Sequence, residues 1–326
     1  AVERMKRGGC DTLIWEASSQ SQLMKRTAAI CPDAAGFTNL SPDHIGGAEH
    51  ESFEEYVYWK SRLFERCEKA VLCADDAYTQ ELIKQLSVPY TTYACFTSAD
   101  ITADNTQSLR ENNFFGVSFD CVSSYGKVRM CAAMPGIFSV QNALAAAAVC
   151  FEYGASPEKI AEAMKTAKVR GRNEVIEVPA DFDVIIDYAH NGQSFNSVLE
   201  TFSSYEHSRI ITVFGSVGDR AQLRRQEMGL ISGKKADLSI ITSDDPGFED
   251  PLAIAKEIAL YVEKAGGKYE IETNRERAVA LAMQKAEKGD IVLLLGKGHE
   301  TVQKVMGEKV PYSDHEALKK YFEENV

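Results

Sequence analysis

The sequence predicts a two-part α/β protein whose second half is a doubly wound, Rossmann-like domain. Four short apolar runs in that half are each followed by polar turn residues: 183–187, 210–214, 238–242 and 291–295. Continuous apolar runs bounded by turns are typical of strands buried in a parallel sheet. Amphipathic helical patterns lie between them, for example at 251–264 and 275–287, and alternation of strand and helix is typical of a doubly wound fold.

The elements expected in the first half are more varied. Apolar runs predict strands at 11–16, 34–40 and 70–73, and helical periodicity predicts helices at 19–29, 54–67 and 76–86. Alternation at 114–130 predicts antiparallel strands, the Ala-rich stretch 142–153 predicts a helix, and Ser156-Pro157 begins another. The connector 169–173 has the composition of a junction, so we expect domains at 1–169 and 170–326.

Composition and charge exclude several classes of protein. The formal charge of −12 argues against nucleic-acid binding, which needs a basic surface. No apolar run reaches the ~18 residues of a membrane span, and the N-terminus has no signal-peptide pattern. The eight cysteines all lie between Cys10 and Cys150 and form no Cys-x-x-Cys pair, so we expect reduced thiols in a cytoplasmic protein.

Polar residues follow each of the four apolar runs in the second half. The segments are Tyr188-Ala189-His190-Asn191, Gly215 to Arg220, Ser243 to Gly247, and Gly296-Lys297-Gly298-His299-Glu300. In open α/β sheets ligands bind at the carboxyl ends of the strands. Four such loops therefore predict a polar ligand site at that edge.

The first half offers weaker signals of chemistry. Glu16 ends an expected strand, and a carboxylate there could hold Mg²⁺, although an exposed glutamate is the more common explanation. The run Thr38-Asn39-Leu40-Ser41-Pro42-Asp43-His44 follows the next expected strand. Lys60 lies in a helical stretch, where spacing alone gives it no special role.

Taken together, these segments resemble the Mur ligases, the ATP-dependent amide ligases of peptidoglycan synthesis, and most closely their MurE (UDP-N-acetylmuramoyl-tripeptide synthetase) branch. The matching motifs occur in the family's order: Glu16-Ala17-Ser18-Ser19, Thr38 to His44, Asn142-Ala143-Leu144, Gly171-Arg172-Asn173-Glu174, Asp187-Tyr188-Ala189-His190, Gly218-Asp219-Arg220 and Gly296 to Glu300. They cover nearly the whole chain, and so many ordered matches are far more specific than one. The resemblance implies an incomplete central ATPase domain followed by a Rossmann-like C-terminal domain.

The resemblance also implies an activity, its cofactors and its partners. ATP would phosphorylate a carboxylate of UDP-N-acetylmuramoyl-L-alanyl-D-glutamate, and the amine of a free diamino acid would attack the acyl phosphate. Mg²⁺ would be the metal, because phosphoryl transfer depends on positioning and charge neutralisation. We expect a cytoplasmic monomer without a membrane span or a nucleic-acid partner.

Site residues carry over from the family position by position. The catalytic and metal-binding set would be Glu16, His44 and Lys60, with Lys60 as its carbamate. The ATP-binding set would be Asn142, Arg172, Asp187, Tyr188 and His190. The UDP-muramoyl substrate would contact Ser18, Arg26, Thr38 and Asn39. The incoming amino acid would contact Arg220, Asp244, Asp245, Gly296 and Glu300.

Four departures from the family pattern qualify these expectations. The phosphate-binding Gly-x-Gly-Lys-Thr loop is missing, so we expect the chain to begin inside the central domain of a longer protein and to be impaired as a ligase by itself. Ser139 replaces one family asparagine, and Gly192 stands where x-Pro usually follows. Gly247 replaces the arginine that meets the distal carboxylate of diaminopimelate, while Asp244, Asp245 and Glu300 suit an ammonium. We therefore expect lysine, or another diamino acid, rather than diaminopimelate, unless Arg224 or Arg225 supplies a cation.

Two alternatives remain open from the sequence. The chain could come from a related ligase, such as a cyanophycin or folylpolyglutamate synthetase, although Gly296 to Glu300 and the position of Lys60 favour the MurE branch. It could also be a non-catalytic, degenerate ligase module, as the missing phosphate loop would allow. The retained charged residues argue against that alternative.

Overall fold

The computed structural model describes residues 2–40, 50–111, 114–218 and 222–325. Contacts divide the chain into two compact units. The first consists of residues 1–104, 120–128 and 141–160, and the second of residues 105–119, 129–140 and 161–326. The expected domain boundary between residues 169 and 170 is not tested by this division and stays a prediction.

The second unit is built on a six-stranded sheet of order β11-β10-β9-β12-β8-β7. Its strands are β7 (Glu174–Ile176), β8 (Asp183–Asp187), β9 (Ile210–Phe214), β10 (Leu238–Ile241), β11 (Tyr269–Ile271) and β12 (Ile291–Leu295). Strands β8 to β12 pair in parallel, and β7 runs antiparallel beside β8. Strands β8, β9 and β12 are parallel, so their carboxyl ends lie at the same edge of the sheet. Because β12 lies between β8 and β9, these three ends are neighbours, as the predicted doubly wound fold requires.

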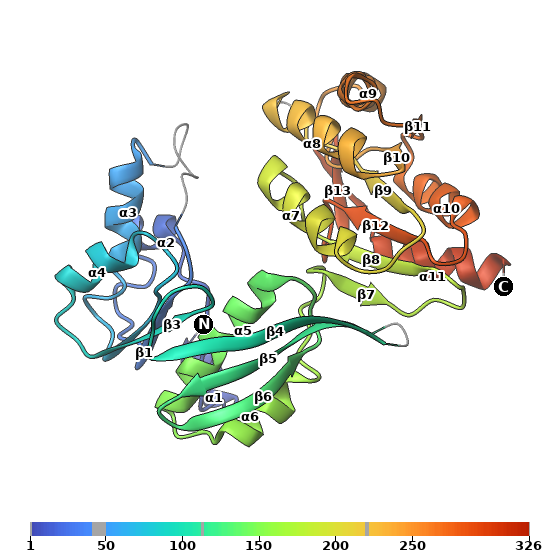
Figure 1. Cartoon of the computed structure of the whole chain (residues 1–326). Coiled ribbons are helices and arrows are strands. Elements are labelled where there is room, and N and C mark those ends of the chain that lie inside the picture. The colour runs from blue at the N-terminus through green and yellow to red at the C-terminus, as the bar shows by residue number, and fades with distance from the viewer. Residues whose placement is uncertain (1, 41–49, 112–113, 219–221, 326) are drawn as a thin grey trace. The chain divides into compact units, whose positions relative to one another are not determined.

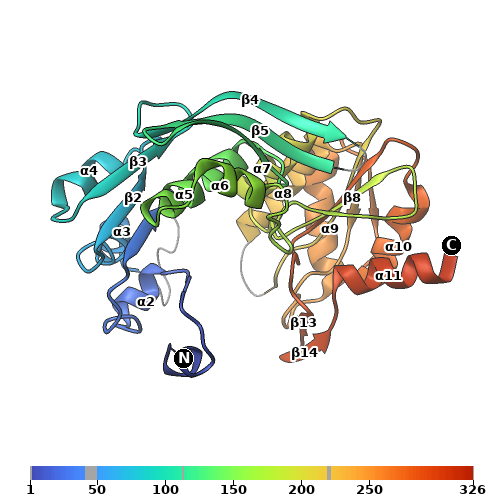
Figure 2. The same cartoon turned by 90° about the horizontal axis from the view of Figure 1, so that it is seen from below.

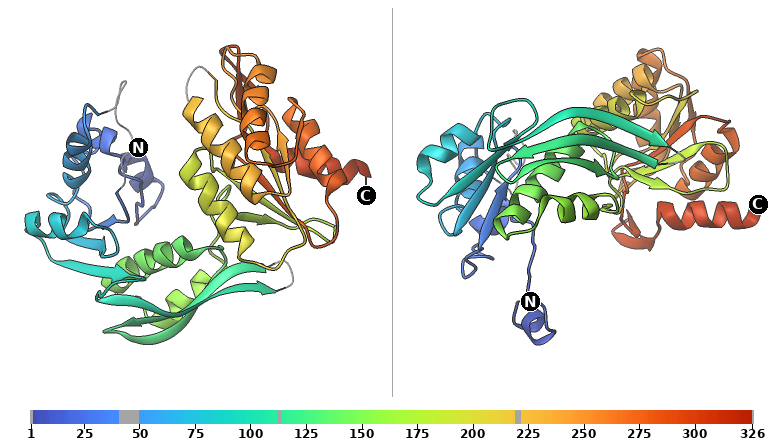
Figure 3. Two further views of the ribbon diagram at one scale, coloured as in Figure 1. Left: turned by 45° about the horizontal axis from the view of Figure 1, so that its top comes forward. Right: turned by 60° about the horizontal axis from the view of Figure 1, so that its bottom comes forward.

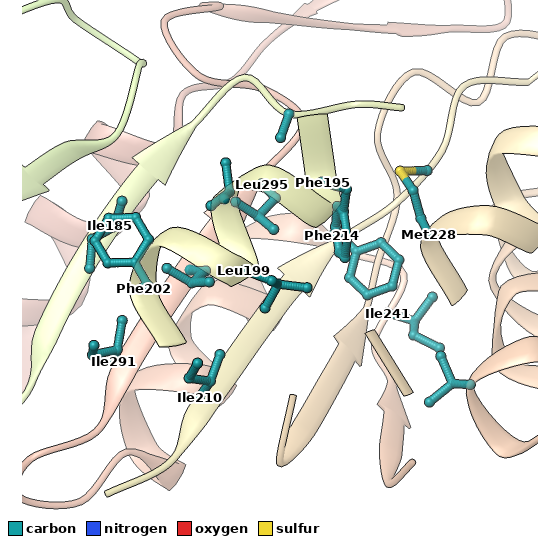
Figure 4. Close-up of a cluster of buried hydrophobic side chains, with 14 of the residues drawn as sticks. Ile185, Phe195, Leu199, Phe202, Ile210, Phe214, Met228, Ile241, Ile291 and Leu295 are labelled. Atoms are coloured by element: carbon teal, nitrogen blue, oxygen red, sulfur yellow. The ribbon is translucent and has the colours of Figure 1, made fainter. Parts of the chain in front are cut away.

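Helices cover both faces of this sheet (Figures 1 and 3). One face carries α7 (Gly192–Ser203), α8 (Gln222–Lys235) and α9 (Pro251–Lys264), and the other carries α10 (Arg275–Lys285) and α11 (Asp314–Asn325). Alternate residues of one strand therefore enter different cores. Ile185 lies beside Phe202 on the α7 side (Figure 4), whereas Val184 and Ile186 pack with residues of α10 and α11. Burial on both faces explains why these strands are continuously apolar.

A short hairpin, β13 (Val302–Val305) and β14 (Glu308–Pro311), projects from this unit (Figure 2). The loop after β10 is attached to it. The side-chain amide of Gln303 donates a hydrogen bond to the carbonyl oxygen of Asp244 at 2.8 Å, and Gly247 forms a parallel bridge with Val305. The hairpin therefore fixes the backbone of the Asp244–Gly247 loop.

The first unit contains the parallel strands β1 (Ala34–Phe37), β2 (Lys69–Cys73) and β3 (Tyr90–Ala94). Strands β4 (Ile101–Glu111), β5 (Phe114–Ser123) and β6 (Gly126–Ala132) follow in a sheet of order β1-β2-β3-β4-β5-β6, and each has residues in both units. The helices of the first half are α1 (Val2–Arg7), α2 (Ser19–Leu23), α3 (Phe53–Ser61), α4 (Thr79–Gln85), α5 (Ile137–Glu152) and α6 (Pro157–Met164).

Several expectations for the first half need correction, and one is that the helix expected at 54–67 ends at Ser61. Residues 11–16 form no strand: they belong to no ladder of the described sheets, and the side chain of Ile14 is 91% exposed. Helix α2 ends at Leu23, well before residue 29, because the chain turns where Lys25 takes a positive φ of 55°. Strands β3 and β4 were not expected. The residues of β4 are mostly polar and carry no apolar alternation.

Candidate functional site

Glycines let the loops after β9 and β10 pack against each other. A Cβ atom on Gly215 would lie 2.3 Å from the carbonyl oxygen of Thr242, and one on Gly218 would lie 1.8 Å from that of Pro246. The backbone amide of Gly218 also donates a hydrogen bond to the carbonyl oxygen of Asp245 at 2.8 Å. No residue with a side chain fits at either position without moving the backbone.

A second glycine contact joins the connector before β7 to the loop after β12. Gly171 has a φ of +70°, and a Cβ atom there would lie 2.2 Å from the amide nitrogen of His299. Gly298 has a φ of +50°, and its Cβ would lie 2.8 Å from the carbonyl oxygen of Gly171. The two backbones touch because neither residue has a side chain, which places Arg172 beside the Gly296–Glu300 loop.

Three carboxylates surround the ammonium group of Lys297 at this edge of the sheet. The Nζ atom of Lys297 lies 2.8 Å from Asp245, 2.5 Å from Glu300 and 3.6 Å from Asp244. The side chain of Lys297 is fully buried, and that of Glu300 is 28% exposed. The acidic cluster expected from the sequence therefore already contains an ammonium group, supplied by the chain itself.

The ionisation of this cluster follows from its packing. Burial lowers the pKa of Lys297, but the three carboxylates outweigh burial and raise that pKa above its usual value. Burial raises the pKa of Asp244 despite the nearby cations Arg275 and Lys297. Burial also raises the pKa of Asp245, yet the hydrogen bond from Lys297 leaves it below its usual value. Lys297 is thus a stable cation, and Asp245 its anionic partner.

A second group of polar side chains adjoins this cluster. The hydroxyl of Tyr188 donates a hydrogen bond to Glu300 at 3.2 Å, and the guanidinium of Arg172 lies 4.9 Å from the centre of the Tyr188 ring. The Nδ1 atom of His190 lies 2.8 Å from the carbonyl oxygen of Tyr188, and the two rings are in edge contact at 4.7 Å. An aromatic ring beside a guanidinium is a surface on which a planar ligand can stack.

Asp187 anchors the loop that carries these side chains. Its two carboxylate oxygens accept hydrogen bonds from the backbone amides of Asn173 (2.6 Å) and Ala189 (2.7 Å). Burial raises the pKa of Asp187, although these hydrogen bonds act in the opposite direction. Asp187 therefore ties the connector carrying Arg172 to the loop carrying Tyr188 and His190.

Lys60 occupies a defined place in the first unit. Its Nζ atom lies 3.1 Å from the hydroxyl of Tyr56 and 3.3 Å from the carbonyl oxygen of Asn39, in the loop after β1. It also lines a cavity of about 340 Å³ between α3 and α4. The structure therefore brings Lys60 and Asn39 together.

Two consecutive aspartates after β2 hold neighbouring loops. Asp76 accepts a hydrogen bond from the amide of Leu40 at 2.7 Å. Asp75 accepts hydrogen bonds from the amides of Cys95 (2.7 Å) and Phe96 (3.0 Å) and from the side-chain amide of Gln141 on α5 (3.2 Å). Burial raises the pKa of Asp75, but these hydrogen bonds outweigh burial and lower it below its usual value.

Comparison with known protein families shows which family the chain matches. Residues 1–150 match the Mur ligase middle domain, and residues 171–298 match the Mur ligase glutamate ligase domain. The chain belongs to the Mur ligase family.

Curated relatives are of the MurE type. The chain is 37% identical over 323 residues to a UDP-N-acetylmuramoyl-L-alanyl-D-glutamate–2,6-diaminopimelate ligase of Caldanaerobacter subterraneus, which covers 98% of this chain and 66% of that protein. It is 35% identical to the corresponding L-lysine ligase of Streptococcus sanguinis, over 95% of this chain and 62% of that protein. A solved diaminopimelate ligase matches with a TM-score of 0.67 and 27% identity, over 95% of this chain and 64% of that one. The chain thus spans just under two thirds of the length of these relatives.

The Mur ligase site residues expected from the sequence fall into separate groups. Arg172, Asp187, Tyr188 and His190 lie beside Asp244, Asp245, Gly296 and Glu300 at one edge of the C-terminal sheet. His44 and Arg220 lie outside the described residues. Glu16 is exposed in irregular chain, Ser18 caps α2 through the amide of Ser21, and Arg26, Thr38 and Asn142 are exposed. The roles assigned to all these residues stay predictions.

Sequence reasoning missed four residues that shape the site. Lys297 had a signal, because it lies inside the Gly296–Glu300 motif. Asp75 and Asp76 had a weaker one, as a pair of acids directly after an apolar strand. No signal in the sequence marked Arg275, since an ordinary exposed arginine could equally begin an amphipathic helix. It is in fact buried, with its guanidinium on Asp314 at 2.8 and 2.9 Å and on the carbonyl oxygen of Leu295 at 2.9 Å.

The expected magnesium ligands fit the described residues only in part. Lys60 lies among oxygen atoms, where the Tyr56 hydroxyl could donate a hydrogen bond to a carbamate but the Asn39 carbonyl could not. Glu16 is exposed, and His44 lies outside the described residues. Asp244, Asp245 and Glu300 have ligand atoms within 4.8 Å of one another, but the Lys297 ammonium lies among them, so this cluster does not suit a metal ion. Magnesium at Glu16, His44 and Lys60 stays a prediction.

Proposed function

We propose that the protein is an ATP-dependent amide ligase that adds a diamino acid to UDP-N-acetylmuramoyl-L-alanyl-D-glutamate. The observation that supports this most is the adjacency of two residue sets at one sheet edge, where Tyr188 of the nucleotide set donates a hydrogen bond to Glu300 of the amino-acid set. A ligase needs the phosphorylated carboxylate and the attacking amine at one place. The relatives named for this reaction support the same assignment.

In this proposal the reaction has two balanced steps. A carboxylate oxygen of the dipeptide attacks the γ-phosphorus of ATP, and ADP leaves. The amine then attacks the acyl carbon, a proton is lost from nitrogen, and inorganic phosphate leaves with the carboxylate oxygen. Magnesium would neutralise phosphate charge. Arg172 and Tyr188 would hold the nucleotide, and Glu300 would orient the amino acid.

For the incoming amino acid we propose L-lysine over diaminopimelate, on a narrower argument than charge. The expected attraction between a substrate ammonium and the acidic cluster is weakened by two lysines of the chain. The ammonium of Lys297 already lies among the carboxylates, and that of Lys304 lies 3.5 Å from Asp245. The preference for lysine therefore depends on Gly247, which has no guanidinium for a distal carboxylate. Arg225 is not available either, since its guanidinium is paired with Glu249 at 2.8 Å and Glu257 at 2.7 Å.

The remaining expectations are proposals of the same kind. We propose a cytoplasmic monomer that binds no nucleic acid, with ATP and Mg²⁺ as cofactors. In the described part of the chain, no helix is long and apolar enough to span a membrane. The two alternatives differ in ATP turnover. A related amino-acid ligase would use ATP with another pair of substrates, and a non-catalytic module would not turn over ATP.

The deciding experiment is a coupled ADP-release assay with the full-length protein, ATP, Mg²⁺ and the UDP-muramoyl dipeptide. Lysine, ornithine and meso-diaminopimelate are added in parallel. A separate reaction, with a folate as the carboxylate substrate and glutamate as the amine, tests for a folylpolyglutamate-type ligase. ADP release that requires both the dipeptide and a diamino acid supports the proposal. Turnover with none of the diamino acids would refute it. Turnover with folate and glutamate would then favour the related ligase, and no turnover in any mixture would favour the non-catalytic module.

A further inference from the structure

The buried ammonium of Lys297 raises a question that the proposed function leaves open, namely which charge the acidic cluster is built to hold. Lys297 comes from the loop after β12, whereas Asp244 and Asp245 come from the loop after β10. Its side chain is 0% exposed and its Nζ atom lies within 2.8 Å of two carboxylates. An ordinary lysine is almost never fully buried unless it is paired.

We propose that Lys297 is a positioning residue whose ammonium serves as the resident cation of the amino-acid pocket, fixing Glu300 and Asp245 and taking the place that a substrate ammonium would otherwise occupy. This inference rests on the proposed function, because the pocket is the one assigned to the incoming amino acid. It goes beyond that proposal by giving the acidic cluster a cation from the chain itself rather than from the substrate.

The hydrogen bonds of Glu300 support a positioning role. One carboxylate oxygen of Glu300 lies 2.5 Å from Lys297 Nζ, and the other accepts the hydroxyl of Tyr188 at 3.2 Å. A carboxylate held at both oxygens cannot rotate freely. Lys297 and Tyr188 thus set its orientation towards any ligand that approaches its exposed side.

The hydrogen bonds of Asp245 show that it is committed to the protein. One of its oxygens accepts Lys297 Nζ at 2.8 Å and the backbone amide of Lys304 at 3.0 Å, and the other lies 3.5 Å from Lys304 Nζ. Asp245 therefore links the loops after β10 and β12 to the β13 strand. Asp244, which is only 4% exposed, lies behind it and is influenced by the buried Arg275 as well.

The charge balance supports the same conclusion. Without Lys297, three carboxylates would lie close together at a mostly buried site, and like charges brought together there are strongly unfavourable. Lys297 and Lys304 offset much of this negative charge, whereas the buried Arg275 near Asp244 is already paired with Asp314. An ammonium from a substrate would then gain less from these acids than it would from an uncompensated cluster. The pocket should recognise the α-amino acid end and the shape of the side chain instead.

The test removes the Lys297 ammonium in two variants, one that fills the space of the side chain and one that leaves it empty. Lys297→Met retains a flexible apolar stem without the charge, and Lys297→Ala leaves room for n-propylammonium, which has the missing three carbons and nitrogen. Lys304→Ala is the matched control, because Lys304 also contacts Asp245 but is 59% exposed. n-Propanol, which has the same length and no charge, is the control for the added amine.

In the full-length protein, we expect Lys297→Met to raise the KM for the amino acid by more than about tenfold while the KM for ATP changes far less. We expect Lys297→Ala to lower the melting temperature by on the order of 10 °C, because unpaired buried charges are costly. n-Propylammonium, but not n-propanol, should raise the melting temperature of Lys297→Ala and leave the wild type and Lys304→Ala unchanged.

Rescue by n-propylammonium with an amino-acid-specific KM effect supports the inference. A wild-type KM in Lys297→Met, or a melting temperature of Lys297→Ala that ignores n-propylammonium, would overturn it. The stability readout is independent of ligase activity. If the wild-type protein joined no diamino acid, the proposed function would fail. The melting temperatures with n-propylammonium would still show whether the Lys297 ammonium stabilises the acidic cluster.

Discussion

Tyr188 and Glu300 are 112 positions apart in the chain, yet the hydroxyl of Tyr188 donates a hydrogen bond to the carboxylate of Glu300 at 3.2 Å. Tyr188 follows β8 and Glu300 follows β12, and these strands are direct neighbours in the sheet. The hydrogen bond therefore joins the two residue sets that we propose bind the nucleotide and the amino acid. Burial and the nearby Glu300 carboxylate both raise the pKa of Tyr188, so its hydroxyl remains a donor at neutral pH.

Replacing Tyr188 by phenylalanine tests the value of that contact. A hydrogen bond to a charged acceptor contributes about 1.5–3 kcal/mol, so Tyr188→Phe should weaken the affinity for the amino acid by roughly tenfold while keeping the ring beside Arg172. A double-mutant cycle with Glu300→Gln should give non-additive effects on KM. Additive effects would mean that the two side chains act independently. Tyr269→Phe, at a more exposed tyrosine on β11, is the control.

Gly171 offers a test of the backbone contact beneath the site. An alanine there would combine a strained positive φ with a Cβ atom 2.2 Å from the amide nitrogen of His299. Gly266 has a similar φ of +83° but no atom within 4 Å of its Cβ position. Gly266→Ala should cost about 1 kcal/mol from backbone strain alone, and Gly171→Ala several kcal/mol.

Urea denaturation followed by far-ultraviolet circular dichroism measures both free energies of unfolding. Equal losses in the two variants would contradict the close approach of residues 171 and 299. The expected difference isolates the steric contribution, because the conformational strain is matched.

Asp75 predicts an acid-sensitive first unit. Its folded-state pKa is lowered, so the stabilisation is present at neutral pH and is lost as pH falls from the ordinary aspartate value of about 3.9 through the lower folded value. Asp75→Asn should therefore destabilise by about 1–3 kcal/mol at pH 7 and by less at about pH 3. Both tryptophans, Trp15 and Trp59, lie in the first unit, so their fluorescence reports its unfolding.

The control for this experiment is Asp33→Asn, at an exposed aspartate of the same unit. A penalty for Asp75→Asn that is the same at both pH values would show that the carboxylate charge does not contribute. In that case the hydrogen-bonding geometry alone, which asparagine partly keeps, would account for the effect.

Lys60 should act through a carbamate if it plays the role that the Mur ligase resemblance implies. Lys60→Ala should then abolish ligase activity in the full-length protein, and added acetate or formate should restore part of it by occupying the place of the carbamate. Lys84→Ala, at an exposed lysine of α4, should leave activity unchanged. Full activity of Lys60→Ala would exclude a catalytic carbamate at this position.

The sequence predicted the four strands β8, β9, β10 and β12 of the C-terminal sheet, because strands buried on both faces are largely apolar, but it did not predict the three-residue strands β7 and β11. It could not predict β4, whose residues are mostly polar. It also could not predict that 11–16 forms no strand, since a strand forms only where a neighbour completes its ladder. Motif order predicted which loops carry the site. The burial of Lys297 and Arg275 was not predicted, because burial of a charged side chain depends on partners that are distant in the chain. These partners are Asp245 for Lys297 and Asp314 for Arg275.

The choice between lysine and diaminopimelate is testable at Gly247. Its backbone is fixed, since its amide donates to the carbonyl oxygen of Lys304 at 3.1 Å and its carbonyl accepts the amide of Met306 at 2.8 Å. A side chain at this position would start from a known place in the loop after β10. Gly247→Arg would put a guanidinium where the Mur ligase resemblance implies an arginine in diaminopimelate-adding members. Bidentate pairing with a carboxylate is among the strongest polar contacts.

We expect the wild-type protein to prefer lysine in kcat/KM by more than about tenfold, and Gly247→Arg to shift the ratio towards diaminopimelate by a similar factor. The φ of Gly247 is +60°, so any side chain adds strain of about 1 kcal/mol or more. Gly247→Ala carries that strain without the guanidinium and is the matched control. A wild-type preference for diaminopimelate would refute the specificity argument. An identical selectivity in Gly247→Arg and Gly247→Ala would show that the distal end of the substrate is recognised elsewhere, because the strain would then be the only effect of the substitution.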